Sequence, residues 1–161
     1  MTRKPRRASS AESKPLWSLS VAESARRLMA CEVTATELAE ARLARIAEID
    51  GRVHSYIHVA AERAHRVAAE VDAEIKAGRR RSALAGIPFG VKDNYDVAGM
   101  PATAGSKLRL DHVATRDAPV IRDLEAAGAV LLGKLATWEY GTGNGGEYFD
   151  LTFPQIGRAH V

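Results

Sequence analysis

The chain has 161 residues, the length of one typical domain, and its 46% hydrophobic and 27% charged residues are ordinary for a globular protein. Its net charge is +3, but residues 1–15 hold five basic side chains and one acidic one, so the remainder carries −1. A basic tail on a nearly neutral body argues against a nucleic-acid-binding domain. No apolar run approaches the ~18 residues of a membrane span, and the single cysteine, Cys31, permits neither an internal disulfide nor a multi-cysteine zinc site. These features fit a protein of the reducing cytoplasm without a membrane anchor.

Two amphipathic helices are predicted after the basic arm, which itself is predicted to be disordered. Ser20 and Thr34 are each followed three residues later by a glutamate, which is the spacing of a capping box. They predict helices over residues 20–30 and 34–49, which we expect on the outside of a larger structure. Asp50 and the glycine after it predict the end of the second helix.

Residues 53–59 favour an extended segment, and residues 60–77 favour a third helix because β-branched residues recur every four positions within it. His54 and His58 would share a helical face, but no third ligand lies nearby in the sequence, so no metal site is expected. No other cofactor is expected either. Cys31 has apolar neighbours in the sequence and is predicted to be a small buried side chain.

A strand–helix–strand unit is predicted in the second half of the chain. Residues 88–91 and 129–132 form short apolar runs, both typical of buried strands. Between them, Asp117 would cap a helix over residues 117–127, whereas residues 103–115 have too little periodicity for anything but a loop. This order predicts an α/β architecture in which the two strands are parallel.

Lys92 follows the first of these strands, within residues 84–94, which read LAGIPFGVKDN. A lysine at that place either bends its head out to water or loses its charge. An uncharged, buried lysine can act as a general base or as a Schiff-base amine. The alternative is an ammonium that reaches solvent or pairs with Asp93 or Asp96, and the local residues alone favour this alternative.

Residues 84–94 resemble the segment around the catalytic lysine of the amidase signature family, which are serine hydrolases of amide bonds. Further segments similar to the family follow in the same order and at compatible spacing, namely residues 101–106, 117–134 and 137–141. The resemblance extends from about residue 19 to residue 155. It implies an α/β/α layered mixed-sheet fold with outer N-terminal helices, of which residues 16–155 would be the N-terminal portion of a single amidase domain.

The resemblance implies a Ser–Ser–Lys triad, in which Lys92 is the position that matches the lysine. One serine would attack the amide carbonyl, and a second serine would carry its proton to the lysine. No Gly-Gly-Ser-Ser run occurs in the 161 residues, so both serines are missing and the chain alone is expected to be inactive. The resemblance also places Gly141, Thr142 and Gly143 along the acyl pocket, where small residues would leave room for a small-molecule amide substrate.

The last six residues, 156–161, are similar to a translated sequencing adapter and are expected to be a non-native tail on a truncated gene fragment. The intact parent is predicted to hydrolyse amide bonds. Within the same family, the alternative is the amidase subunit of a tRNA-dependent amidotransferase, which would need partner subunits, and a homodimer also stays open. The alternative from another class is a non-catalytic binding module in which Lys92 is solvated.

One further pattern imitates a nucleotide-binding motif. Gly128, Gly133 and Lys134 have the spacing of a P-loop, but the four residues between the glycines are Ala-Val-Leu-Leu, which predict a strand rather than a phosphate cradle. Asp93 and Glu139 are acidic neighbours of the predicted site. Cap and surface roles are expected for both rather than contact with substrate.

Overall fold

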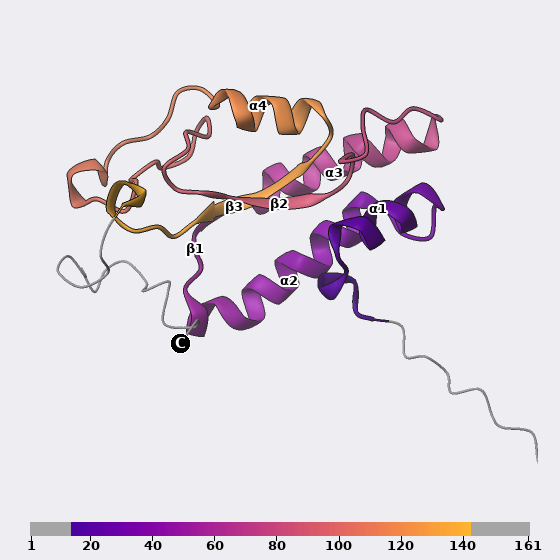
Figure 1. Ribbon diagram of the computed structural model, residues 1–161, viewed down its shortest axis with the longest axis horizontal. Helices are drawn as coiled ribbons and strands as arrows, with labels where there is room; N and C mark the ends of the chain where they lie inside the picture. Colours follow the sequence, from indigo (N-terminus) through magenta and orange to yellow (C-terminus); the bar gives the residue numbers. More distant parts are fainter. Residues whose placement is uncertain (1–13, 143–161) are drawn as a thin grey trace, which may run out of the picture.

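The computed structural model describes residues 14–142, and Figure 1 shows how they are arranged. The elements in chain order are η1 (Leu16–Ser18), α1 (Val21–Met29), α2 (Ala35–Val53), β1 (Tyr56–Val59), α3 (Ala61–Lys76), β2 (Pro88–Lys92), η2 (Lys107–Arg109), α4 (Pro119–Ala126), β3 (Val130–Leu135) and η3 (Glu139–Gly141), where η marks a 3-10 helix. The predicted tail and nearly all of the predicted arm lie outside the described residues.

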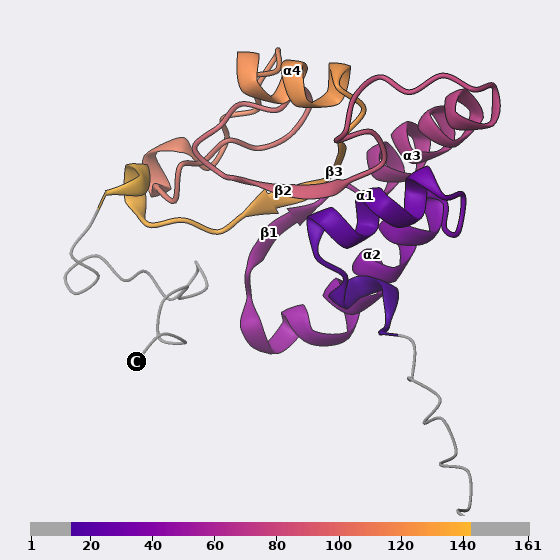
Figure 2. The same ribbon diagram turned by 45° about the vertical axis from the view of Figure 1, so that its right-hand side comes forward.

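The three strands form one mixed sheet in the order β1-β3-β2. β3 lies in the centre, parallel to β2 and antiparallel to β1, so the predicted parallel pairing is confirmed. α4 covers one face of the sheet, whereas α1, α2 and α3 pack on the other, and Figures 1 and 2 show both layers. The predicted mixed α/β fold with outer N-terminal helices is therefore what these residues form.

Two apolar cores lie on the two faces of the sheet. The larger core joins Leu28 of α1, Leu38 of α2 and Val67 of α3 to Val130 and Leu132 of β3. The buried members of the smaller core are Ala60, Val91, Val97, Met100, Ile121 and Leu131. Consecutive residues at the start of β3 therefore alternate between the two cores, as the side chains of a regular strand do.

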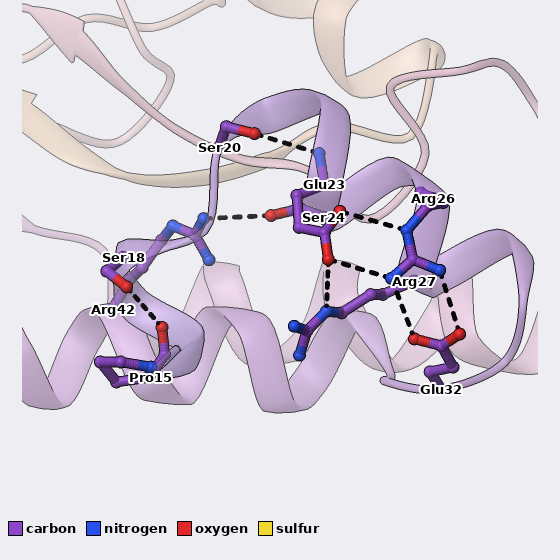
Figure 3. A network of polar contacts seen from close by, with 9 residues as sticks. All are labelled: Pro15, Ser18, Ser20, Glu23, Ser24, Arg26, Arg27, Glu32 and Arg42. Atoms are coloured by element: carbon purple, nitrogen blue, oxygen red, sulfur yellow. Dashed lines mark hydrogen bonds and ion pairs between the residues drawn. The ribbon is translucent and has the colours of Figure 1, made fainter. Parts of the chain in front are cut away.

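The N-terminal helices begin where the capping pattern predicts. The Oγ of Ser20 accepts the backbone N–H of the glutamate three residues later at 3.2 Å, and Thr34 forms a complete capping box. Arg42 of α2 reaches back to α1, where it donates to the Oγ of Ser24 at 3.3 Å (Figure 3). Local capping thus sets where each helix starts, and a longer-range contact holds the two helices together.

A carboxylate in α3 also accepts hydrogen bonds from the first turn of α2. Oδ1 of Asp72 accepts the N–H of Ala35 at 2.6 Å, and Oδ2 accepts the N–H of Thr36 at 3.0 Å. A carboxylate at a helix N-terminus pairs with N–H groups that have no partner inside the helix, and it complements the helix dipole. The two helices are therefore joined by polar contacts as well as by the larger core.

The end of α2 differs from the prediction. The helix continues through Asp50 and Gly51 to Val53 and ends at His54, whose φ of 53° is left-handed. The carboxylate of Asp50 accepts the N–H of Ser55 at 2.8 Å, so it shapes the turn after the helix rather than stopping the helix. A glycine in an exposed helix costs only about 1 kcal/mol, which the packing of α2 overrides.

Asp117 does not cap α4, contrary to the prediction. The helix starts after Ala118, and the Asp117 carboxylate accepts the N–H of Ala98 at 2.8 Å and a hydrogen bond from Arg63 at 3.0 Å. Burial acts to raise the pKa of Asp117, but these two donors outweigh it and hold the pKa below its ordinary value. Arg63 also pairs with Glu125 at 2.7 Å, so its guanidinium joins α3 to α4.

Cys31 lies in the tight turn between α1 and α2. Its φ of 52° is left-handed, and its N–H donates to the backbone oxygen of Leu28 at 3.2 Å. Leu28 and Val33 are buried on either side of the turn, but the cysteine itself is exposed. The predicted burial of Cys31 is therefore wrong, because the chain has already left the helix at this residue.

Candidate active site at the ends of β2 and β3

Lys92 is the last residue of β2, and the carboxyl ends of β2 and β3 lie side by side because these strands are parallel. The side chain of Lys92 is exposed, and its Nζ donates to the backbone oxygen of Gly141 at 3.5 Å. Within residues 14–142 it forms an ion pair with neither Asp93 nor Asp96, which have other partners. Of the two predicted positions for the lysine head, buried or reaching solvent, these residues show the second.

The backbone of Gly141 lies directly beside the head of Lys92, and we call it the backbone wall. Its φ is 74°, and a Cβ added there would lie 2.9 Å from Nζ of Lys92 and 3.2 Å from Nδ2 of Asn94. Only a residue without a side chain lets the lysine head occupy this position. The structure therefore brings Lys92 and Gly141 together, places Thr142 next in the chain at an exposed position, and leaves Gly143 outside the described residues.

A second lysine lies at the end of the neighbouring strand and is fully buried. Nζ of Lys134 lies 2.8 Å from Oδ1 of Asp93, and both side chains have 0% exposure. Lys134 also donates to the backbone oxygen of Pro101 at 2.8 Å. The contact with Asp93 is an ion pair of charges rather than an aligned hydrogen bond, since Oδ1 has no hydrogen-bond partner within the described part of the chain. The predicted surface role of Asp93 is therefore wrong.

A bulge in β3 directs Lys134 towards this pair. Two consecutive residues of β2 pair with Leu131 and Gly133, so Leu132 between them has no partner on β2. One extra residue reverses the alternation of side chains beyond it. Lys134 pairs with Val91 and so points to the face of the smaller core, which is the face of Leu131. A Cβ at Gly133 would collide with the backbone of β1, so the bulge requires glycine.

Asp93 also holds the loop formed by residues 101–106, which we call the threonine loop. Its Oδ2 accepts both the N–H of Thr103, at 3.0 Å, and the hydroxyl of the same residue. The Oγ1 of Thr103 in turn accepts the N–H of Gly105 at 3.1 Å. Glu139, the other acidic residue near the predicted site, is half-buried and opens η3.

Two features are absent from the described residues. Within residues 14–142, no group of three or more His, Cys, Asp or Glu side chains is placed to hold a metal ion. In the same residues, none of the helices is long and apolar enough to cross a membrane.

Comparison with known proteins places this arrangement in a family. The sequence profile of the amidase family matches residues 37–150. The chain is 41% identical over 138 residues to a glutamyl-tRNA(Gln) amidotransferase subunit of Anaeromyxobacter dehalogenans, covering 86% of this chain and 28% of that protein. The corresponding subunit of Paenarthrobacter aurescens is 43% identical over 133 residues, which are 80% of this chain and 26% of that protein.

Solved structures give the same result. The peptide amidase of Stenotrophomonas maltophilia superposes with a TM-score of 0.73 and 38% sequence identity, over 78% of this chain and 26% of that one. The layered fold and the family match define an amidase type of protein, and the chain belongs to the amidase signature family. It spans 26–28% of the length of these relatives.

Proposed function

We propose that the protein hydrolyses amide bonds of small molecules with a serine nucleophile, and that Lys92 is the general base of a Ser–Ser–Lys triad. The observation that carries this proposal is the position of Lys92 at the carboxyl end of a parallel strand, with Nζ 3.5 Å from the oxygen of Gly141. Family membership supports the reaction class, since the matched residues 37–150 include this strand.

The geometry around Lys92 suits the proposed proton transfer. The attacking serine must lose its hydroxyl proton as it bonds to the amide carbon, and the bridging serine would pass that proton to a free amine at Nζ. The exposed head of Lys92 leaves room for a hydroxyl to approach, and Gly141 adds no side chain beside it. The proposal further requires that the full-length protein removes this head from water, since a solvated lysine keeps its proton at neutral pH. The segment from Gly141 to Gly143 would then line the acyl side of the pocket.

Turnover by the full-length product of the source gene tests the role of Lys92. Lys92→Arg keeps the positive charge but has no accessible free base, and Lys92→Met keeps the length of the side chain without either. We expect both to lower kcat by about 10²–10⁴-fold on a simple carboxamide, the range of a lost general base. Lys76→Met, at the end of α3, is the matched control. Turnover that survives both changes would show that Lys92 is not the base and would overturn the Ser–Ser–Lys assignment. No turnover by the unmodified full-length product would favour a non-catalytic binding module with a solvated lysine.

The 161-residue chain alone is proposed to be inactive. It supplies the lysine, but no Gly-Gly-Ser-Ser run that could supply the nucleophile and its bridge. An assay of the purified chain should give no amide turnover above that of its Lys92→Met variant. Lysine-dependent turnover by this chain would refute the Ser–Ser–Lys assignment.

A second candidate is the amidase subunit of a tRNA-dependent amidotransferase, working in the cytoplasm with partner subunits. The relatives from Anaeromyxobacter dehalogenans and Paenarthrobacter aurescens, named as such subunits, favour it. A stand-alone amidase, as a monomer or homodimer, should turn over simple amides when purified alone. An amidotransferase subunit should purify with other chains, and its amide turnover should depend on them.

A further inference from the structure

The Asp93–Lys134 pair joins three segments at a point directly beside Lys92. Asp93 follows Lys92 in the chain, and its N–H donates to the backbone of β3 at 2.9 Å, which extends the pairing of β2 with β3 by one residue. Its carboxylate holds the threonine loop through Thr103, and Lys134 holds the same loop through the oxygen of Pro101. The end of β2, the end of β3 and the loop are therefore fixed to one another by two buried charges.

The threonine loop in turn holds the segment that contains Gly141. The backbone oxygen of Ala104 accepts the N–H of Tyr140 at 2.7 Å. Gly105 approaches the backbone before Tyr140 so closely that a Cβ on it would collide. Gly141 follows Tyr140, and its oxygen accepts from Nζ of Lys92. The contacts thus form a closed circuit that starts and ends at Lys92.

A buried ion pair is not explained by stability alone. The cost of removing two charges from water often equals or exceeds their attraction, and apolar replacements of the whole pair are often neutral or stabilising. The Asp93–Lys134 pair is fully buried, yet each of its members also holds one point of the same loop. An apolar pair could fill this space, but it could not make these directed contacts.

We propose that Asp93 and Lys134 are positioning residues, whose ion pair fixes the separation of Lys92 from the backbone wall at Gly141. The effect acts through the threonine loop and Tyr140, and neither residue needs to touch substrate. Its importance for amide turnover rests on the proposed function, whereas the positioning itself does not.

Hydrogen exchange of the Tyr140 amide in the 161-residue chain measures this positioning, because that N–H is the contact between the loop and the wall. Asp93→Asn and Lys134→Met should each speed its exchange about tenfold beyond the change at Val71, which reports the larger core. The double variant Asp93→Asn/Lys134→Met removes both charges and keeps the test valid where a single variant fails to fold. In the double variant, the Val71 amide should exchange at nearly its wild-type rate, whereas the Tyr140 amide should still exchange faster than in the wild type.

Arg63→Gln is the matched control, since it breaks an ion pair between α3 and α4 that has no part in the circuit. It should change Tyr140 and Val71 by the same factor. If the Asp93 and Lys134 variants also change the exchange rates of Tyr140 and Val71 by the same factor, the pair only stabilises the fold. The positioning role is then overturned. Wild-type protection of Tyr140 in the double variant would overturn it as well.

Kinetics of the full-length enzyme then connect positioning to turnover. Asp93→Asn/Lys134→Met should lower kcat about 10²-fold, as expected for a base misplaced by about 1 Å, with a smaller change in KM. Arg63→Gln should leave kcat within about threefold of wild type. A normal kcat in the double variant, together with a large loss in Lys92→Met, would overturn the positioning role and leave the proposed function intact. Normal turnover in Lys92→Met would reject Lys92 as the general base while leaving the exchange result to decide the positioning.

Discussion

The parallel strands β2 and β3 end beside each other, and a lysine lies at the end of each, yet the two lysines have opposite surroundings. Both follow short apolar runs that contain a glycine. Lys92 is exposed, whereas Lys134 is fully buried and paired with Asp93. The bulge at Gly133 makes the difference, because it turns Lys134 towards the smaller core. The burial of a lysine at a strand end is thus set by the register of the sheet and not by the local composition.

Removal of the buried charge should give the largest change in stability. Lys134→Met leaves the Asp93 carboxylate buried without a partner, so the free energy of unfolding should fall by about 3–5 kcal/mol. Urea denaturation of the 161-residue chain measures this loss. The double variant with Asp93→Asn should recover most of it. A loss below about 1 kcal/mol would mean that water reaches the site and that the two lysines differ less than their exposure indicates.

The bulge itself gives the next effect. Gly133→Ala places a Cβ against the backbone of β1 and should lower the free energy of unfolding by about 2–3 kcal/mol. Gly51→Ala is the matched control, because nothing lies within 4 Å of its added Cβ and it lies inside α2. That control should stabilise the chain by about 0.5–1 kcal/mol. Equal changes in the free energy of unfolding at the two glycines would show that the bulge is not the cause of the different surroundings of Lys92 and Lys134.

The start of α2 is capped locally as well as by Asp72, so loss of the local cap should have a weaker effect. Thr34→Ala removes the capping box of α2 and should cost about 1 kcal/mol. Thr34→Ser keeps the hydroxyl and should cost only a few tenths of a kcal/mol. Thermal unfolding monitored by circular dichroism distinguishes the two variants. A loss from Thr34→Ala as large as that from Lys134→Met would contradict the difference between the two regions.

The exposed lysine should give the smallest change. Lys92→Met should alter the free energy of unfolding by no more than about 0.5 kcal/mol, because its head is exposed and makes one long hydrogen bond in the described part of the chain. Measured beside Lys134→Met under the same conditions, it separates a lysine that contributes little to stability from one that holds the fold. A loss above about 2 kcal/mol would show that Lys92 also has a structural role.

The sequence predicts well those features that a few neighbouring residues decide. Ser20 and Thr34 mark the starts of α1 and α2 because their capping partners lie three residues away. Asp117 is also a residue type that favours a helix N-cap, but Val120 stands where Ser20 and Thr34 have a glutamate, and Arg63, 54 residues earlier in the chain, binds its carboxylate. Asp50 likewise turns to residues that follow α2. A local pattern cannot show whether a candidate capping side chain is instead bound by residues that are distant in the sequence.

The sequence predicts the site only in part, for the same reason. Resemblance identifies Lys92 and Gly141, but their closeness depends on a loop that no local pattern describes. Lys134 stands out in the sequence only through the spacing of a P-loop, which its neighbours exclude. One signal could have found Lys134. It lies at the end of an apolar run that predicts a buried strand, and Asp93 follows the predicted parallel strand beside it. A buried ammonium needs a buried carboxylate, which Asp93 could supply. The roles of Lys92 in catalysis and of Gly141, Thr142 and Gly143 in binding stay predictions.

The carboxylate of Asp72 at the start of α2 also has a consequence for the order of events during synthesis. It lies 37 residues after Ala35, whose N–H it accepts. At about 5–20 residues per second on the ribosome, roughly 2–7 s pass between the two residues. During that interval the first turn of α2 relies on the capping box of Thr34 and Glu37. In a nascent chain halted before Asp72, the N–H groups of Ala35 and Thr36 have only water as a partner in place of that carboxylate. The polar cap at the start of α2 is therefore completed only after α3, which is synthesised later, has supplied Asp72.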